Sequence, residues 1–277
     1  MLPIPVLLYH RLDGRRDGLS TSPELFERQL AWLADHGYRT LSLEAFEYAM
    51  SGRCAPPAKS VMITFDDGFD DLGTVAAPLL RMHGFTAVAF LITGWCSGAY
   101  GDPVHFAANE QVEPVPHRKR VMSPSFGNPI AWRTVREIAA EGTISFQSHT
   151  HCHAEWGADA ADHEWLRADL LVSLETIAAE LRLPKGSFRH IAWPWGRCNP
   201  EWERIAASLG FDHQYIVQRG AVTRTDMSIR LPRICMDGAS RTSFAAWLPI
   251  LASAGGSRLV NRTFGLIRAH RHGIGYL

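Results

Sequence analysis

A pair of adjacent carboxylates stands directly after an apolar, strand-like segment of this 277-residue chain. The segment covers residues 60–65, and Asp66 and Asp67 follow it before Gly68. Neighbouring side chains at the end of a strand can point in different directions, so one carboxylate can bind a metal ion while the other accepts a proton. Barrel enzymes keep catalytic groups at this end of a strand. An Asp-Asp-Gly sequence is also a common turn, so the pair alone does not establish a site.

Three histidines within five residues follow a second strand-like segment, residues 144–147. His149 and His153 converge on one ion if the chain forms a helical turn, whereas His149 and His151 face the same way on an extended strand. Two imidazoles and one carboxylate are a common ligand set of catalytic zinc and leave room for water and substrate. Cys152 is a competing ligand, but a lone cysteine more often packs in a core. The two clusters together predict a metal site.

Strand-like and helical patterns alternate along the whole chain, which indicates β/α units. We expect strands at 6–9, 60–65, 85–92, 144–147, 188–193, 215–217 and 229–234. We expect helices from Pro23 to before Gly37 and at 42–50, 72–82, 132–141, 162–183, 200–209 and 242–254. These seven or eight β/α units, without an internal repeat, predict a closed or nearly closed barrel in a single domain spanning 1–277.

Two segments do not fit the alternation. Residues 93–130 are polar and rich in glycine and proline, and we interpret them as a long insertion; a solvated surface loop is the alternative. Residues 255–277 form a basic tail. We interpret it as a solvated terminus, and contact with an anionic substrate or membrane surface is the alternative.

The composition excludes several classes of protein. Lys plus Arg and Asp plus Glu both number 28, so no excess of basic residues supports nucleic-acid binding. No apolar run approaches the roughly 18 residues of a membrane span. The five cysteines are scattered without a C-x-x-C pair, which favours a reducing compartment. Because residues 1–8 lack a basic region before the apolar ones, we expect a cytoplasmic protein.

Three motifs resemble those of the polysaccharide deacetylases, carbohydrate esterase family 4. They are Thr64-Phe65-Asp66-Asp67-Gly68, His149-Thr150-x-x-His153 and Trp193-Pro194-Trp195-Gly196. The resemblance covers roughly residues 4–235. It implies a distorted (β/α)7–8 barrel and a divalent metal, usually zinc, with cobalt or nickel as alternatives. It also implies hydrolysis of N-acetyl or O-acetyl groups on sugars.

The resemblance gives roles to residues of these motifs. The implied metal ligands are Asp67, His149 and His153. Asp66 is the implied general base that takes a proton from water, and the backbone N–H of Trp195 is implied to help hold the oxyanion. Trp193 and Trp195 flank the implied site, where their rings could stack on a pyranose face; packing in the core is the alternative for such residues.

The general acid is predicted from the start of the chain. Pro5-Val6-Leu7-Leu8-Tyr9-His10-Arg11 is similar to the opening of a circularly permuted subgroup that includes poly-β-1,6-N-acetylglucosamine deacetylases. In that subgroup the histidine of the Tyr-His motif is the acid, which implies His10. His270 and His272 are the alternatives. A histidine that titrates near neutrality suits protonation of a leaving amine.

An arginine is expected to orient the base. Leu231-Pro232-Arg233-Ile234 also matches the permuted subgroup, and it makes Arg233 the candidate to orient Asp66. Arg189 lies five residues before Pro194, farther than the family's arginine, so it is the poorer candidate.

We therefore expect a metal-dependent hydrolase that removes acetyl groups, above all N-acetyl, from a glycan, oligosaccharide or glycan precursor. One alternative is an amidohydrolase on the same barrel that acts on a non-glycan amide, and the expected cytoplasmic location favours it. A catalytically inactive sugar-binding protein is another, but every residue of the implied metal and base set is present, which argues against it.

Overall fold

The computed structural model describes residues 2–96, 127–156, 160–223 and 229–270. Eight strands within these ranges pair in parallel, in the order β1-β8-β7-β6-β5-β4-β3-β2. They are β1 Val6–Tyr9, β2 Arg39–Thr40, β3 Ser60–Phe65, β4 Ala87–Leu91, β5 Ile144–Ser148, β6 His190–Ala192, β7 His213–Val217 and β8 Ile229–Cys235. Because β1 also pairs with β3, seven strands close into a ring and β2 lies outside it. This closed barrel confirms the predicted fold class.

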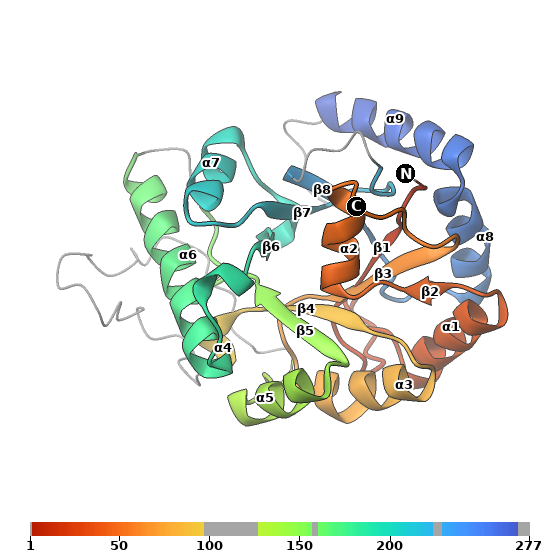
Figure 1. Ribbon diagram of the computed structural model, residues 1–277, viewed down its shortest axis with the longest axis horizontal. Helices are drawn as coiled ribbons and strands as arrows, with labels where there is room; N and C mark the ends of the chain where they lie inside the picture. The colour runs from red at the N-terminus through yellow and green to blue at the C-terminus, as the bar shows by residue number, and fades with distance from the viewer. Residues whose placement is uncertain (1, 97–126, 157–159, 224–228, 271–277) are drawn as a thin grey trace.

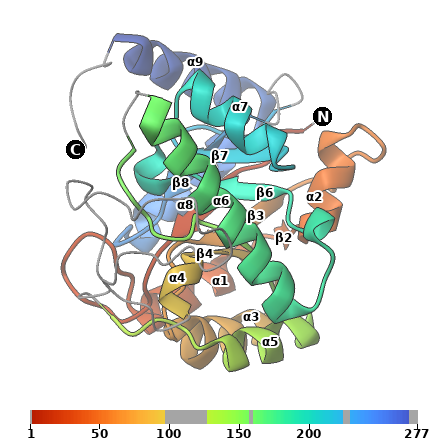
Figure 2. The same ribbon diagram turned by 90° about the vertical axis from the view of Figure 1, so that its left-hand side faces the viewer.

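Helices surround the ring of strands (Figure 1), and α6 runs across one side of it (Figure 2). They are α1 Pro23–Asp35, α2 Leu43–Met50, α3 Ala77–Met82, α4 Thr93–Cys96, α5 Trp132–Glu141, α6 Ala160–Leu181, α7 Pro200–Ser208, α8 Arg241–Ala252 and α9 Ala254–His270. A π-helical turn, Leu72–Ala76, precedes α3, and 3-10 turns form at Lys185–Ser187 and Pro194–Gly196. In the described ranges, no helix has both the length and the apolar character that crossing a membrane requires.

Alternate residues of each strand separate the inside of the barrel from its outer wall. In β4, Val88 and Phe90 belong to one buried cluster with inward side chains of the other strands. Ala87, Ala89 and Leu91 belong to a second, larger cluster that also contains the apolar faces of the helices. The molecule therefore has a core inside the barrel and a core between the barrel and its helices.

Helix α2 closes the N-terminal end of the barrel rather than packing on its outer wall. Its Phe46 ring lies 6.2 Å from the ring of Tyr215 and 6.4 Å from the rings of both His190 and His213. Phe46 also belongs to the interior cluster. In Figure 1, α2 crosses the middle of the ring of helices. The opposite, C-terminal end of the strands is left for a functional site.

The structure differs from the sequence-based expectation in three segments. Arg39–Thr40 forms β2, which was not predicted. Thr93–Cys96, the start of the expected insertion, forms helix α4, and residues 97–126 of that insertion lie outside the described residues. The expected basic tail begins as helix α9, because Gly255 and Gly256 fall in its first turn instead of ending a helix there.

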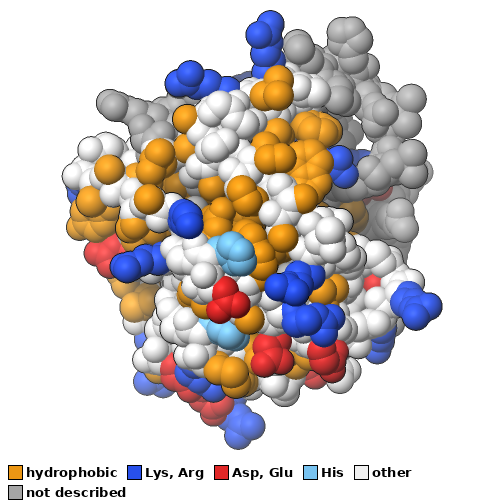
Figure 3. Space-filling model, turned by 90° about the vertical axis from the view of Figure 1, so that its right-hand side faces the viewer, with side chains coloured by type: hydrophobic (Ala, Val, Ile, Leu, Met, Phe, Trp, Pro, Cys, Tyr) orange, Lys and Arg blue, Asp and Glu red, His pale blue; other side chains and the backbone are white. Residues whose placement is uncertain are grey.

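Helix α8 covers the barrel wall but keeps apolar side chains on its outer side. Phe244, Leu248 and Leu251 are buried, and α8 packs against α1 and α9. Trp247 and Ile250 are 40% and 44% exposed. Figure 3 shows apolar side chains gathered on the side of the molecule that carries α1 and α8. This helix therefore contributes to both the core and an apolar part of the surface.

Candidate active site

Polar residues that follow strands β3 and β5 meet at the C-terminal end of the barrel, the end where barrel enzymes keep their active sites. Nε2 of His149 lies 3.4 Å from Oδ1 of Asp67, and Nε2 of His153 lies 3.8 Å from the same oxygen. One ligand atom from each of the three residues lies within 4.8 Å of the other two, and all three side chains are buried. The structure thus brings together the three residues predicted as metal ligands.

A tight turn after β3 positions Asp67. Its φ is 72°, in the left-handed region that aspartate tolerates better than most residues, and Gly68 follows with a φ of 88°. The carbonyl of Asp67 accepts a hydrogen bond from the N–H of Ile92 at 3.1 Å. A Cβ at position 68 would lie 2.6 Å from Cδ2 of Leu91. Both the conformation and the close approach therefore require glycine at position 68.

A second turn, after β5, brings His153 back toward the barrel. Thr150 and His153 have φ values of 69° and 50°, so the segment is not an extended strand. The Asp169 carboxylate, on α6, accepts hydrogen bonds from the N–H groups of His151 and Cys152, both at 2.9 Å. Backbone strain of this kind gathers at functional sites where the surrounding contacts hold it in place. Here one buried carboxylate holds the turn.

The two competing ligands lie outside the cluster. His151 Nδ1 and the Thr93 hydroxyl are hydrogen-bonded at 2.9 Å. Cys152 is buried, and its burial, with the charge of Asp169, raises the pKa of its thiol well above the usual value. A protonated thiol is a poor metal ligand. The turn geometry thus selects the pair four residues apart.

Hydrogen bonding and charge prepare the cluster for a cation. Nδ1 of His149 lies 2.7 Å from the carbonyl oxygen of Ala192, so it donates its proton there and Nε2 remains as the ligand atom. Burial and the neighbouring His149 lower the pKa of His153 to about 3, which leaves this imidazole neutral. Burial acts to raise the pKa of Asp67, but the nearby His149, His10 and His153 hold it well below its usual value. A neutral imidazole and an ionised carboxylate fit a divalent metal.

Asp66 is paired with Arg233 inside the barrel. Nη1 and Nη2 of Arg233 donate to the two carboxylate oxygens at 2.6 and 2.7 Å, and both side chains are buried. Burial acts to raise the pKa of Asp66, but Arg233 and then His149 outweigh it and hold that pKa below its usual value. Asp66 therefore stays ionised, 3.8 Å from Nε2 of His149.

His10 is paired with Asp237, a residue that the sequence did not point to. The Asp237 carboxylate lies 2.5 Å from His10 Nδ1 and also accepts the His10 backbone N–H at 3.1 Å. Burial acts to lower the pKa of His10, but Asp237, with smaller effects from Asp67 and Asp66, raises it to about 9. His10 is thus protonated at neutral pH. The one sequence feature that could have indicated Asp237 is its position just beyond the strand-like segment 229–234.

The two tryptophans of the third motif have different surroundings. Trp195 has a φ of 54°, and its ring meets the ring of His153 edge-on at 4.4 Å. Trp193 is fully buried, and its Nε1 donates to Gln214 at 3.1 Å. Its side chain cannot stack on a sugar from there, which corrects the predicted substrate contact. Trp193 directly follows β6 and faces the same side as Ile191, so it packs in the core between the barrel and its helices.

The remaining candidates lie elsewhere. Arg189 precedes β6 and forms an ion pair with Asp212 at 2.7 Å, at the opposite end of the barrel from Asp66. His270 is the last residue of α9, and His272 lies outside the described residues. Arg233 and His10 are the candidates that the structure brings to the site.

Comparisons with known sequences point to one family. The family model described as polysaccharide deacetylase matches residues 54–213. YxkH of Bacillus subtilis (strain 168), whose name places it in that family, is 26% identical over 254 residues, which cover 88% of this chain and 76% of YxkH. A poly-beta-1,6-N-acetyl-D-glucosamine N-deacetylase of Escherichia coli (strain K12) is 24% identical over 232 residues, which cover 78% of this chain but 33% of that protein.

Solved structures share the barrel. IcaB from Ammonifex degensii aligns with a TM-score of 0.72 and 22% identity, over 90% of this chain and 97% of that one. The Streptococcus pyogenes deacetylase PplD aligns with a TM-score of 0.71 and 24% identity, over 89% of this chain and 98% of that one. At this level of identity the structural likeness establishes the fold, and the family match establishes the relationship. The chain belongs to the polysaccharide deacetylase family.

Proposed function

We propose that this chain hydrolyses N-acetyl groups on a glycan, with Asp66 as general base, His10 as general acid and a metal ion on Asp67, His149 and His153. The observation that carries the proposal is that Asp66 and His10 have buried partners of opposite charge. Arg233 stabilises an ionised Asp66, while Asp237 stabilises a protonated His10. Amide hydrolysis needs a group that accepts a proton and a second group that donates one.

Zinc is the metal that we propose, because two imidazoles and one carboxylate are typical of catalytic zinc; cobalt or nickel could replace it. When bound, such an ion polarises the amide carbonyl and makes water acidic enough to attack near neutral pH. The hydrogen bond from His149 to the carbonyl of Ala192 fixes the direction of its ligand atom.

The proposed reaction follows from the positions of the charged groups. Asp66 accepts a proton from the attacking water, and Arg233 holds the base in place. The backbone N–H of Trp195 donates to the oxygen that becomes negatively charged. His10 then gives its proton to the nitrogen of the leaving amine, and the N–C bond breaks. Acetate and a free amino sugar are the products.

The substrate class comes from the relatives. The Escherichia coli protein and a Staphylococcus aureus (strain MRSA252) relative are both named poly-beta-1,6-N-acetyl-D-glucosamine N-deacetylases. We therefore propose an N-acetylglucosamine-containing glycan, oligosaccharide or precursor as the substrate. The cytoplasmic location remains a prediction from the sequence.

The direct test is release of acetate from N-acetylglucosamine oligomers by the metal-stripped protein, before and after addition of zinc or cobalt. We expect release only with metal, and its loss in Asp66→Asn. Absence of release from a protein with a filled metal site would instead favour an amidohydrolase with another substrate. A cluster that accepts no metal would favour a sugar-binding protein.

A further inference from the structure

A second cluster of two histidines and a carboxylate lies at the N-terminal end of the barrel. His190 is the first residue of β6, His213 is the first residue of β7, and Glu47 comes from α2, which closes this end. One ligand atom from each of the three lies within 4.8 Å of the other two. Since the strands are parallel, this cluster and the candidate active site lie at opposite ends of the barrel.

The contacts orient His190 toward Glu47. Its Nε2 lies 2.9 Å from Oε1 of Glu47, and its Nδ1 lies 3.0 Å from the hydroxyl of Tyr215. Tyr215 is buried inside the barrel, so it supports the imidazole from behind as the carbonyl of Ala192 supports His149 in the other cluster. A ring nitrogen held in this way is the usual arrangement of a metal-binding histidine.

His213 completes the cluster with an unused hydrogen-bonding atom. Its side chain is only 7% exposed, and its Nδ1 has no hydrogen-bond partner among the described residues. Its ring stacks on that of His190, with the ring centres 4.3 Å apart and the planes at 23°. A buried ring nitrogen without a partner is costly unless something binds it.

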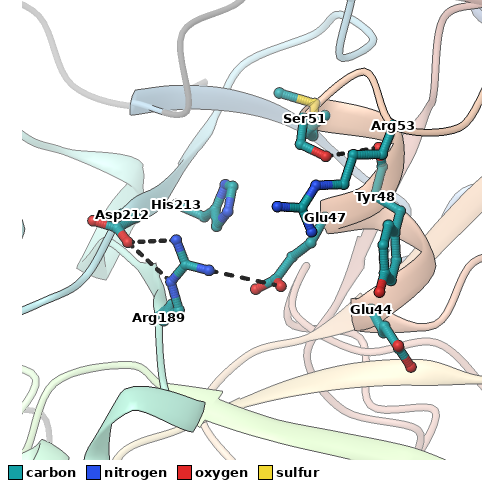
Figure 4. Close-up of a pocket in the computed structure, with 9 residues that line it drawn as sticks. Glu44, Glu47, Tyr48, Ser51, Arg53, Arg189, Asp212 and His213 are labelled. Carbon is teal, nitrogen blue, oxygen red and sulfur yellow. Dashed lines mark hydrogen bonds and ion pairs between the residues drawn. The ribbon is translucent and has the colours of Figure 1, made fainter.

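A cavity of about 470 Å³ adjoins this cluster. Figure 4 shows Glu47 from α2 and His213 from β7 on the walls of the same space, with Arg189 beside Asp212. Arg189 is held by Asp212 at 2.7 Å and lies 3.9 Å from Glu47. The charged residues that line the cavity are Glu44, Glu47, Asp212, Arg53 and Arg189, so carboxylates outnumber guanidinium groups.

We propose that Glu47, His190 and His213 bind a second divalent metal ion, of the zinc, cobalt or nickel class. As the ion binds Nε2 of His190, the proton that faces Glu47 would be released and Nδ1 would take up a proton and donate it to the hydroxyl of Tyr215, so the imidazole stays neutral. Because the two imidazole rings lie nearly parallel, both nitrogens meet one ion only after the His213 ring turns, and the adjoining cavity gives that ring space. Burial lowers the pKa of both imidazoles, that of His213 to about 4, so both are neutral and ready to bind.

The second ion would be structural. It ties α2 to the first residues of β6 and β7 and so closes the N-terminal end of the barrel. Strand β6 contains three residues, and its last one, Ala192, accepts the hydrogen bond that orients His149. The ion would therefore anchor the same strand that supports the candidate active site.

Metal stoichiometry tests the proposal. The metal-stripped full chain is titrated with zinc, and bound zinc is measured for the parent, for Asp67→Asn/His153→Asn, for Glu47→Gln/His213→Gln and for the combination of all four changes. We expect two equivalents of zinc in the parent, one in each double variant and none in the combination. Glu44→Gln, which changes a carboxylate of the same cavity outside the cluster, is the matched control and should bind two.

Thermal unfolding supplies a second measurement. In the Asp67→Asn/His153→Asn background, zinc at about a hundredfold excess over its Kd should raise the Tm by about 5–10 °C. Glu47→Gln alone, a change at a half-buried residue that keeps a hydrogen-bond acceptor, should remove most of that shift without unfolding the protein. One equivalent in the parent and none in Asp67→Asn/His153→Asn would overturn this second site and leave the proposed deacetylase site intact. If the parent bound one equivalent of zinc and only Glu47→Gln/His213→Gln abolished it, the metal ligands proposed for the deacetylase site would be wrong instead.

Discussion

Arg233 donates two hydrogen bonds to Asp66 across the inside of the barrel, from Nη1 and Nη2 at 2.6 and 2.7 Å. The guanidinium carbon lies 5.3 Å from the centre of the Phe90 ring, which helps to confine it. The two residues are 167 positions apart in the sequence, so closure of the ring of strands creates the pair. This pairing connects the barrel to the chemistry, because it places a charged base in a buried site and keeps it ionised.

Replacing Arg233 by glutamine should raise the pKa of Asp66. Burial then acts without the opposing cation, so the acidic limb of the kcat/KM profile should move to higher pH. The sign follows from the role of the base: Asp66 must be ionised, and activity is lost as the pH falls through its pKa. Arg233→Lys restores the charge without the two-pronged geometry and should place the limb between those of the parent and the glutamine variant.

The pH profile measured with an N-acetylglucosamine oligomer checks this prediction, together with the Tm of each variant. Removing one partner of a buried ion pair costs about 3–5 kcal/mol of folding free energy, so the profile is interpreted only below the new Tm. An acidic limb that stays in place in a folded Arg233→Gln would contradict the proposed role.

Replacing Asp237 by asparagine should move the alkaline limb to lower pH. Burial acts to lower the pKa of His10, and the charges of Asp237, Asp67 and Asp66 raise it to about 9, with Asp237 responsible for most of the increase. A general acid works only while protonated, so activity falls as the pH rises through that pKa. Loss of a neighbouring charge lowers it by about 1–3 pH units. An unchanged alkaline limb would move the acid elsewhere, first to His270 or His272.

Much of the fold could be predicted because the strands have strong local patterns. The apolar segments before Asp66 and His149 marked two strand ends, and parallel strands place such ends together. Strand β2 was missed because two residues carry no periodicity. Helix α9 was missed because Gly255 and Gly256 at its start weaken any helical pattern in the sequence. In the structure, packing against α8 stabilises the helix.

Much of the candidate site was also predictable, but its supporting residues were not. Asp169 and Asp237 are single carboxylates, and nothing in their neighbourhoods says which distant atoms they contact. The burial of Trp193 could have been predicted from the alternation of side chains along β6. Ile191 and Trp193 are two residues apart, so both face the helices outside the barrel. Turn geometry, and not spacing alone, separates His153 from His151.

Two matched histidine variants test the ligand set. His153→Gln should lose the metal at this site and nearly all acetate release, because its Nε2 faces Asp67. His151→Gln should keep both, because His151 Nδ1 bonds to the Thr93 hydroxyl away from the cluster and glutamine can still form a hydrogen bond there. Zinc content and acetate release are measured for each variant. The reverse order of losses would show that the chain binds its metal on an extended segment.

Replacing Asp169 by asparagine should weaken metal binding without touching a ligand. The carboxylate accepts the N–H groups of His151 and Cys152 with separate oxygens, whereas an asparagine offers only one acceptor oxygen. One buried N–H then loses its partner, at a cost of about 1–3 kcal/mol in folding free energy. Because these two residues lie between His149 and His153, the spacing of the ligands loosens, and the zinc Kd should rise by about 10–100-fold.

The measurement is competition for zinc against a chelator of known affinity, with the Tm of the metal-free protein as a control for folding. The effect on zinc should exceed that of Glu175→Gln, a change of an exposed carboxylate on the same helix, paired only with Lys185 among the described residues. Equal Kd values for Asp169→Asn and the parent would mean that the ligands themselves hold the turn. In that case the buried carboxylate would contribute to the stability of the barrel alone, and the Tm would be the only quantity to fall.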